Sequence, residues 1–164
     1  VTNGIISVAI SPASLNYGFF YDITNQTNPV ASAINLVQFN TIGTNNQVTV
    51  VGGTAITVAN AGTYNKVFTV SVQKTSPGAP TIASIWLRYN GADVANSRQD
   101  IEVPNQTALL FVTGSYTLAM AAGSNIQMCW STPDTAVQLS FLPAVVGPVR
   151  PATPSAKVTL TRIS

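Results

Sequence analysis

Apolar and polar residues alternate along most of this chain with a period of two. In the segment 110–120, large apolar side chains recur at even positions, whereas the odd positions from 113 to 117 are small and polar. The segments 68–73, 125–131 and 157–161 repeat the alternation. Because successive side chains of a strand point to opposite faces of the sheet, each segment predicts a β-strand with one buried face. No stretch has the 3.6-residue spacing of an amphipathic helix.

Turn-forming residues divide these strands at short intervals. The clearest is Asn90-Gly91, because both residues tolerate the positive φ that a two-residue hairpin turn requires. The expected strands lie at approximately 17–22, 33–40, 47–51, 54–59, 63–74, 82–89, 97–103, 107–120, 124–131, 135–142 and 156–163. Many short strands without helices favour an all-β sandwich or barrel.

Two segments stand apart from this pattern. Residues 142–156 include four prolines, which cannot donate to a strand ladder, so we expect an extended surface loop there. Residues 1–14 are expected to form an N-terminal arm or linker, and residues 15–164 the domain itself.

The composition predicts a neutral, polar surface. Ser, Thr, Asn and Gln make up 56 of the 164 residues, whereas Lys and Arg number 7 and Asp and Glu number 5. An ordinary soluble domain has about 25% charged residues, and this chain has 7%. So few charges suit a subunit of a larger assembly better than a free cytosolic enzyme.

Several function classes are excluded by the same counts. The chain has no histidine, which removes histidine-based catalysis and histidine-ligated metals. The single cysteine, Cys129, cannot form an intrachain disulfide or a cysteine-rich zinc site. Seven scattered cations make no nucleic-acid surface, and the longest apolar window, 108–130, is too polar for a membrane-spanning helix. We expect no catalytic residue, metal or cofactor.

Asp100 and Glu102 are the one close pair of carboxylates. They are two residues apart on an expected strand and therefore share a face. Such a pair can perform acid–base chemistry or bind Ca²⁺, or it can form a charged edge strand that discourages aggregation. We favour the edge strand, so the chain is not expected to be an enzyme.

Trp86 and Arg88 are the candidate ligand-binding residues. If Ile85 and Leu87 point into the core, Trp86 and Arg88 lie together on the outer face. An indole beside a guanidinium can bind a sugar ring or an acidic patch. The alternative is that a loop or a neighbouring subunit covers Trp86.

Three motifs in order resemble the C1q/TNF-like family. They are Ile56–Tyr64 followed by Phe68, then Ile85–Gly91, and then Ile126–Ser131. The first motif consists of an apolar residue, a gap of five residues and the sequence Gly-x-Tyr. The last two are most similar to members encoded by bacteriophages and other viruses. The chain departs from the family at Lys66, where the family has Phe. We expect Lys66 at the rim of the sandwich, with its amine in water.

The resemblance implies an antiparallel jelly-roll sandwich of about ten strands that assembles as a homotrimer. One sheet, with the strands 63–74, 107–120 and 156–163, would turn its outer face to the three-fold axis. The implied interface residues on that face are Asn65, Val67, Thr69, Ser71, Phe111, Thr113, Ser115, Thr117, Thr159 and Thr161. Their lack of charge suits an axis, where like charges would meet in triplicate.

The resemblance also implies a non-enzymatic structural role at a virion surface. The trimer would decorate a phage capsid or form the head of a fibre or spike, with other virion structural proteins as partners. The loops 22–33, 75–81, 90–97 and 132–135 would be presented outward. Two alternatives remain open. One is a receptor- or carbohydrate-binding module, at a viral host-recognition tip or on a bacterial surface; the other is a capsid-building jelly roll.

Overall fold

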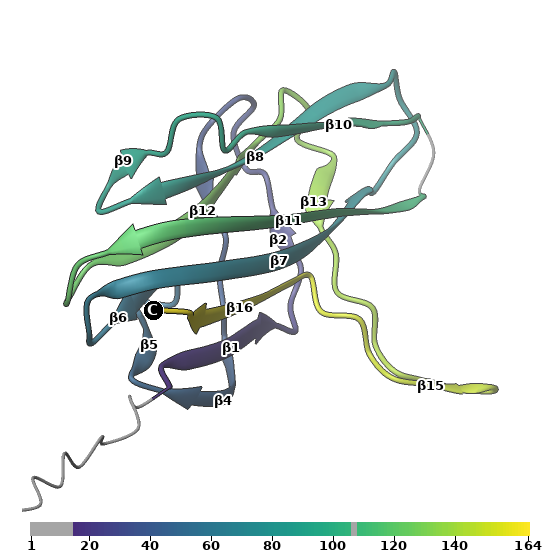
Figure 1. Cartoon of the computed structure of the whole chain (residues 1–164). Helices are drawn as coiled ribbons and strands as arrows, with labels where there is room; N and C mark the ends of the chain where they lie inside the picture. Colours follow the sequence, from purple (N-terminus) through teal and green to yellow (C-terminus); the bar gives the residue numbers. More distant parts are fainter. Residues whose placement is uncertain (1–14, 106–107) are drawn as a thin grey trace, which may run out of the picture.

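The computed structural model describes residues 15–105 and 108–164, which form a sandwich of two antiparallel β-sheets (Figure 1). The expected N-terminal arm, 1–14, lies outside the described residues, as does Thr107, the first residue of one expected strand. All the named elements of the described part are strands, so it holds no helix that could cross a membrane. The prediction of an all-β sandwich is therefore confirmed.

Sheet A has seven strands. They follow the order β2-β13-β7-β16-β1-β4, and β11 pairs with the other edge of β7. The long central strand β7 therefore pairs with β11 on one side, and with β16 and then β13 on the other. The bounds are β1 (Tyr17–Asp22), β2 (Gln26–Thr27), β4 (Thr41–Asn46), β7 (Gly62–Lys74), β11 (Leu109–Met120), β13 (Val137–Leu139) and β16 (Ala156–Arg162).

Sheet B also has seven strands, in the order β10-β8-β12-β6-β5, with β3 paired to β12 and β9 paired to β8. A separate hairpin pairs β14 with β15. The bounds are β3 (Asn35–Leu36), β5 (Val48–Val51), β6 (Ala55–Val58), β8 (Thr81–Tyr89), β9 (Ala92–Asp93), β10 (Gln99–Val103), β12 (Asn125–Ser131), β14 (Val145–Val146) and β15 (Val149–Arg150).

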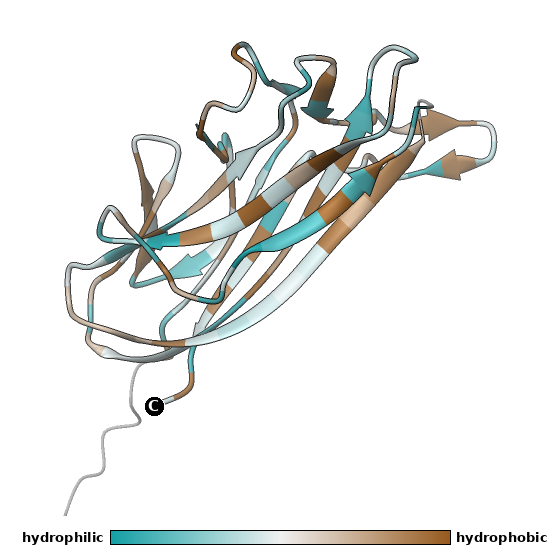
Figure 2. Cartoon of the chain, turned by 90° about the horizontal axis from the view of Figure 1, so that it is seen from above, coloured by the Kyte–Doolittle hydropathy of each residue, from teal (hydrophilic) through white to brown (hydrophobic). Residues whose placement is uncertain are grey.

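The hydrophobic core lies between the two sheets. Phe20, Val70 and Leu160 of sheet A and Leu87 and Met128 of sheet B are fully buried. Hydropathy alternates along the strands in Figure 2, where apolar and polar residues succeed one another within single arrows. Burial of this shared apolar face is the main favourable term that holds the sheets together.

Most expected strands end within two residues of the observed positions, and the larger departures have separate causes. The expected strand 33–40 forms a regular ladder only at Asn35–Leu36, because the amide of Val37 bonds to Met128 and that of Phe39 to Gly53. The polar strand β4, which no alternation predicted, is an edge strand held by its backbone pairing with β1. Its largely exposed side chains need no periodic pattern.

The segment 142–156 is not the purely irregular loop that its prolines predict. It includes the β14–β15 hairpin, which projects away from the two sheets (Figures 1 and 2). A bridge between Leu142 and Thr153 closes its base. The prolines lie outside the four paired residues, at 143, 148, 151 and 154, so they remove no ladder hydrogen bond.

The expected rim position of Lys66 is wrong. The side chain is fully buried on the core face of β7, and its Nζ has no hydrogen-bond partner. The amine lies 5.0 Å from the centre of the Phe68 ring. Burial holds the pKa of Lys66 well below its ordinary value, because the charged form loses its hydration. The alternation therefore continues through this position, and the core accepts an amine where the family pattern has an aromatic ring.

The loops expected to point outward together lie at two ends of the molecule. Ala31, Lys74, Pro77 and Asp134 line one pocket, which gathers three of these loops at one end. The fourth loop follows β8 and lies at the opposite end, near β9 in Figure 1. The two described ends of the chain also lie together, since the amide of Arg162 donates to the carbonyl of Asn16 (2.8 Å).

Candidate functional site

The outer face of sheet A is an ordered array of mostly neutral side chains, which we call the neutral face. Its strands lie in the order β1, β16, β7 and β11, and three cross-strand rows of four residues follow from their register. The rows are Tyr21-Lys157-Thr69-Thr113, Phe19-Thr159-Val67-Ser115 and Tyr17-Thr161-Asn65-Thr117. Lys157 is the one charged side chain in these described rows.

Apolar groups on the neutral face are unusually exposed. Val67 is 41% exposed and Phe111, one row further along β11, is 54% exposed. The rings of Phe19 and Tyr21 stack with their centroids 5.4 Å apart. A hollow of about 90 Å³ lies between Phe19, Val67 and Thr159. An exposed apolar patch rimmed by polar side chains is a common mark of a protein–protein interface.

The polar side chains of the face are tied to each other across the strands. The hydroxyls of Thr69 and Thr113 lie 3.2 Å apart, and the hydroxyl of Ser115 donates to Oδ1 of Asn65 (3.1 Å). These cross-strand bonds hold the surface groups in place, so a partner would order fewer side chains on binding.

Ser71 drops out of the predicted interface. It is buried, since its hydroxyl donates to the carbonyl of Pro154 (3.1 Å) and its amide to that of Ser155 (2.9 Å). The segment between β13 and β16 thus covers this end of β7. The other nine predicted positions are exposed or half-buried on the neutral face. They are Asn65, Val67, Thr69, Phe111, Thr113, Ser115, Thr117, Thr159 and Thr161.

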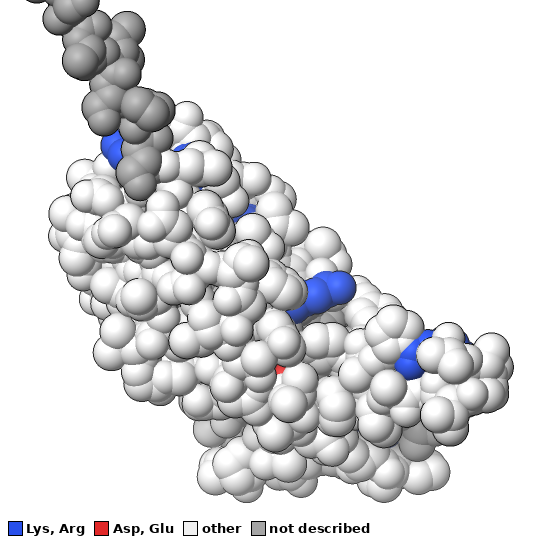
Figure 3. All heavy atoms as spheres, turned by 90° about the horizontal axis from the view of Figure 1, so that it is seen from below, with Lys and Arg blue, Asp and Glu red and all other residues white. Residues whose placement is uncertain are grey.

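The face of the molecule seen in Figure 3 is nearly free of charge. Lysine and arginine form a few separate blue spots on it, and very little red is visible. This agrees with the composition, in which hydroxyl and amide side chains replace the usual charged surface.

The outer face of sheet B has the opposite character. Ile85 and Leu87 are buried, so Trp86 and Arg88 lie together on the outer face, as the alternation predicts. Asp93 Oδ1 accepts hydrogen bonds from Trp86 Nε1 and from Arg88 Nε, both at 2.9 Å. These bonds hold the pKa of Asp93 below its ordinary value, with the indole bond first and the guanidinium second.

Asp93 belongs to this cluster but was not singled out from the sequence. Asn90 and Gly91 have φ of 45° and 83°, and this two-residue turn places Asp93 directly opposite Arg88. The Asn-Gly motif was therefore sufficient to predict that Asp93 pairs with Arg88, because a two-residue hairpin fixes which residues face each other.

A groove of about 400 Å³ runs beside Trp86. Its lining residues are Ser84, Trp86, Asp93, Val94, Asn96, Arg98 and Ser131. Arg88 is not among them. Its guanidinium contacts the groove only through Asp93, whose carboxylate it holds by the Nε–Oδ1 bond. An aromatic side chain beside amide, hydroxyl and charged groups can pack against a sugar ring and bond to its hydroxyls.

Asp100 and Glu102 lie on β10, the edge strand of sheet B. Asp100 accepts a bond from the hydroxyl of Ser84 (2.6 Å) and pairs with Arg98 (3.1 Å). The described residues contain no group of three or more His, Cys, Asp or Glu side chains that could hold a metal ion. Cys129 is buried, and burial raises the pKa of its thiol.

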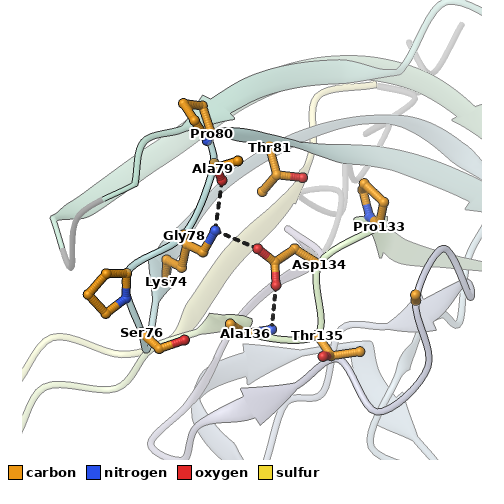
Figure 4. Close-up of a pocket in the computed structure, with 12 residues that line it drawn as sticks. Lys74, Ser76, Gly78, Ala79, Pro80, Thr81, Pro133, Asp134, Thr135 and Ala136 are labelled. Carbon is orange, nitrogen blue, oxygen red and sulfur yellow. Dashed lines mark hydrogen bonds and ion pairs between the residues drawn. The ribbon is translucent and has the colours of Figure 1, made fainter.

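A hollow of about 560 Å³ lies between the loops after β7 and after β12 (Figure 4). Lys74 forms a salt bridge with Asp134 and donates to the carbonyl of Ala79 (2.8 Å). Asp134 also accepts from the amide of Ala136 (2.8 Å). The Lys74 bond holds the pKa of Asp134 below its ordinary value. Since these bonds join the two loops to each other, the arrangement serves as a loop clamp.

No known family model matches the chain, and no curated protein is significantly similar to it.

Proposed function

We propose that the chain is a non-enzymatic structural subunit that forms a homotrimer through its neutral face. The observation that carries the proposal is the combination of exposed Val67 and Phe111 with rows of hydrogen-bonded neutral side chains. Burying these groups requires little desolvation of charge, and it removes apolar surface from water. A face brought to a three-fold axis repeats each charge three times, so neutrality is the property that such a face needs.

The finer description of the fold is part of the same proposal. The strand orders β4-β1-β16-β7-β11 and β10-β8-β12-β6-β5 join distant segments into antiparallel sheets, which supports a jelly roll of the C1q/TNF-like kind. In that arrangement β7, β11 and β16 are neighbours in one sheet, which is the sheet that the resemblance assigns to the trimer axis.

We place the trimer at a virion surface, as a capsid decoration or the head of a fibre or spike. The support is the similarity of Ile85–Gly91 and Ile126–Ser131 to viral members of the family. The exposed apolar groups and the hydrogen-bonded neutral rows make assembly the role that the neutral face supports best.

Sedimentation equilibrium of the purified chain tests the assembly. We expect a trimer at micromolar concentration. Val67→Asp should dissociate it, because the carboxylate would lose its hydration in the contact. Val51→Asp is the matched control, since Val51 is 58% exposed but lies on β5 of sheet B. A native chain that sediments as a single subunit would overturn the proposal, and large shells would favour a capsid-building protein.

A carbohydrate-binding role is a second candidate, and the groove beside Trp86 favours it. An array of bacterial surface glycans should then give binding that Trp86→Ala abolishes. Ile82→Ala is the control, because Ile82 lies on β8 outside the groove lining. The absence of any glycan signal for the native trimer would leave the structural role alone.

A further inference from the structure

The β14–β15 hairpin exposes apolar side chains that its own subunit does not cover. Val146 is 93% exposed and Val149 is 83% exposed, and the two face each other across the hairpin. The strands β14 and β15 pair only with each other. Figures 1 and 2 both draw the hairpin away from the two sheets. A two-stranded ribbon is at best marginally stable in water, so this one needs a surface to pack on.

The base of the hairpin joins the neutral face. The chain enters it after Ser140, whose amide donates to the carbonyl of Ser71 (2.7 Å). It leaves at Ser155, whose carbonyl accepts from the amide of Ser71 (2.9 Å). Phe111 is the cross-strand partner of Ser71. Ser71 therefore lies between the base of the hairpin and the exposed Phe111, so the hairpin leaves sheet A at the margin of the proposed trimer contact.

We infer that the hairpin packs on the neutral face of a second copy of this chain and clasps neighbouring subunits. This rests on the proposed trimer. The apolar parts of the two surfaces match: the hairpin offers valines and one charge, Arg150, and the neutral face offers Val67 and the hollow beside Phe19, which has Lys157 as the one charge in its lining. The outer face of sheet B is a poorer recipient. It holds the ion pairs Arg88–Asp93 and Arg98–Asp100, which would lose water under a valine pair.

The variant Val146→Ser/Val149→Ser tests the clasp by sedimentation. Serine is smaller than valine, so it causes no steric conflict in the hairpin, and it removes the apolar groups. We expect the concentration at which the trimer dissociates to rise by about 100-fold, since each buried valine contributes roughly a tenfold factor. The control Val51→Ser/Ile82→Ser removes two exposed aliphatic side chains (58% and 44%) from sheet B and should leave the trimer unchanged.

Hydrogen exchange of the amides in 145–150 gives a second measurement. Exchange should slow by at least tenfold in the trimer relative to the single subunits of Val67→Asp. A native chain that never trimerises would overturn the proposed function itself. A stable trimer whose hairpin variant associates as the native chain does, or whose hairpin amides exchange equally fast in both states, would overturn the clasp alone.

Discussion

The two outer faces of the sandwich differ in the kind of polar side chain that they present. Sheet A presents rows of hydroxyl, amide and aromatic groups, with Lys157 as the one charge in its described rows. Sheet B gathers Arg88, Asp93, Arg98 and Asp100 into surface ion pairs around a tryptophan. Charged groups remain hydrated on a free surface at little cost, whereas a face that becomes buried is cheaper when neutral. The difference therefore supports the proposal that the outer face of sheet A makes the subunit contact and that the outer face of sheet B stays in water.

The strongest test of this difference truncates one exposed apolar side chain on each face. Phe111→Ala should weaken the trimer by about 30-fold or more per contact, as removal of a central aromatic anchor does. Ile82→Ala removes a side chain that is 44% exposed on sheet B and should change nothing. Sedimentation equilibrium of both variants measures how much each substitution weakens the trimer. Equal effects on the two faces would contradict the assignment of sheet A to the contact.

A second test concerns charge inside sheet A, beneath the neutral face. Lys66→Met replaces a buried amine without a partner by an apolar side chain of similar length. It should raise the free energy of unfolding by about 2 kcal/mol near neutral pH. Urea unfolding of the native chain and the variant measures the gain.

The pH dependence of the free energy of unfolding tests the burial of Lys66 independently. The pKa of Lys66 is lowered in the folded state, so the unfolded chain holds the proton more tightly. Native stability should rise with pH from that lowered pKa up to the ordinary value of 10.5. The advantage of Lys66→Met should therefore shrink across this window. A gap between the two proteins that stays constant with pH would contradict the burial of the amine.

The smallest effect is expected on sheet B. Asp93→Asn weakens an exposed pair and should lower the melting temperature by about 2 °C or less. Because the pKa of Asp93 is lowered, its contribution is present above the ordinary value of 3.8 and is lost as pH falls through the lower folded value. The same substitution should leave the trimer intact. A large drop in melting temperature would mean that sheet B depends on its charges more than exposure suggests.

The strands and their buried faces were predictable because alternation depends only on local sequence. It placed Ile85 and Leu87 inside and Trp86 outside. Where the environment is set by distant segments, the pattern was insufficient. Ser71 has the right phase for the outer face, but the chain at Pro154 covers it. Lys66 has the phase of the core, and expectation from its charge alone placed it in water.

The candidate sites could be predicted only in part, because alternation gives the face of each residue and not its neighbours on other strands. Register supplies the rows of the neutral face once the strand order is known, whereas the motif resemblance only assigned the strands 63–74, 107–120 and 156–163 to one sheet. The projecting hairpin was missed because prolines indicate where a ladder is interrupted, and they do not exclude a short ladder between them. The role of Asp93 could have been predicted, since its pairing with Arg88 follows from the length of the Asn90-Gly91 turn.

The closeness of the two described chain ends has a practical consequence for display. Arg162 bonds to Asn16, and the carbonyl of Ser164 accepts from the amide of Thr63, at the start of β7. Lys74 and the loop clamp lie at the far end of that strand. A passenger peptide fused directly before Leu15 or after Ser164 would therefore leave from the same pole. In the proposed trimer, three passengers would then lie side by side, while the opposite pole remained clear for attachment to a bead or an electrode.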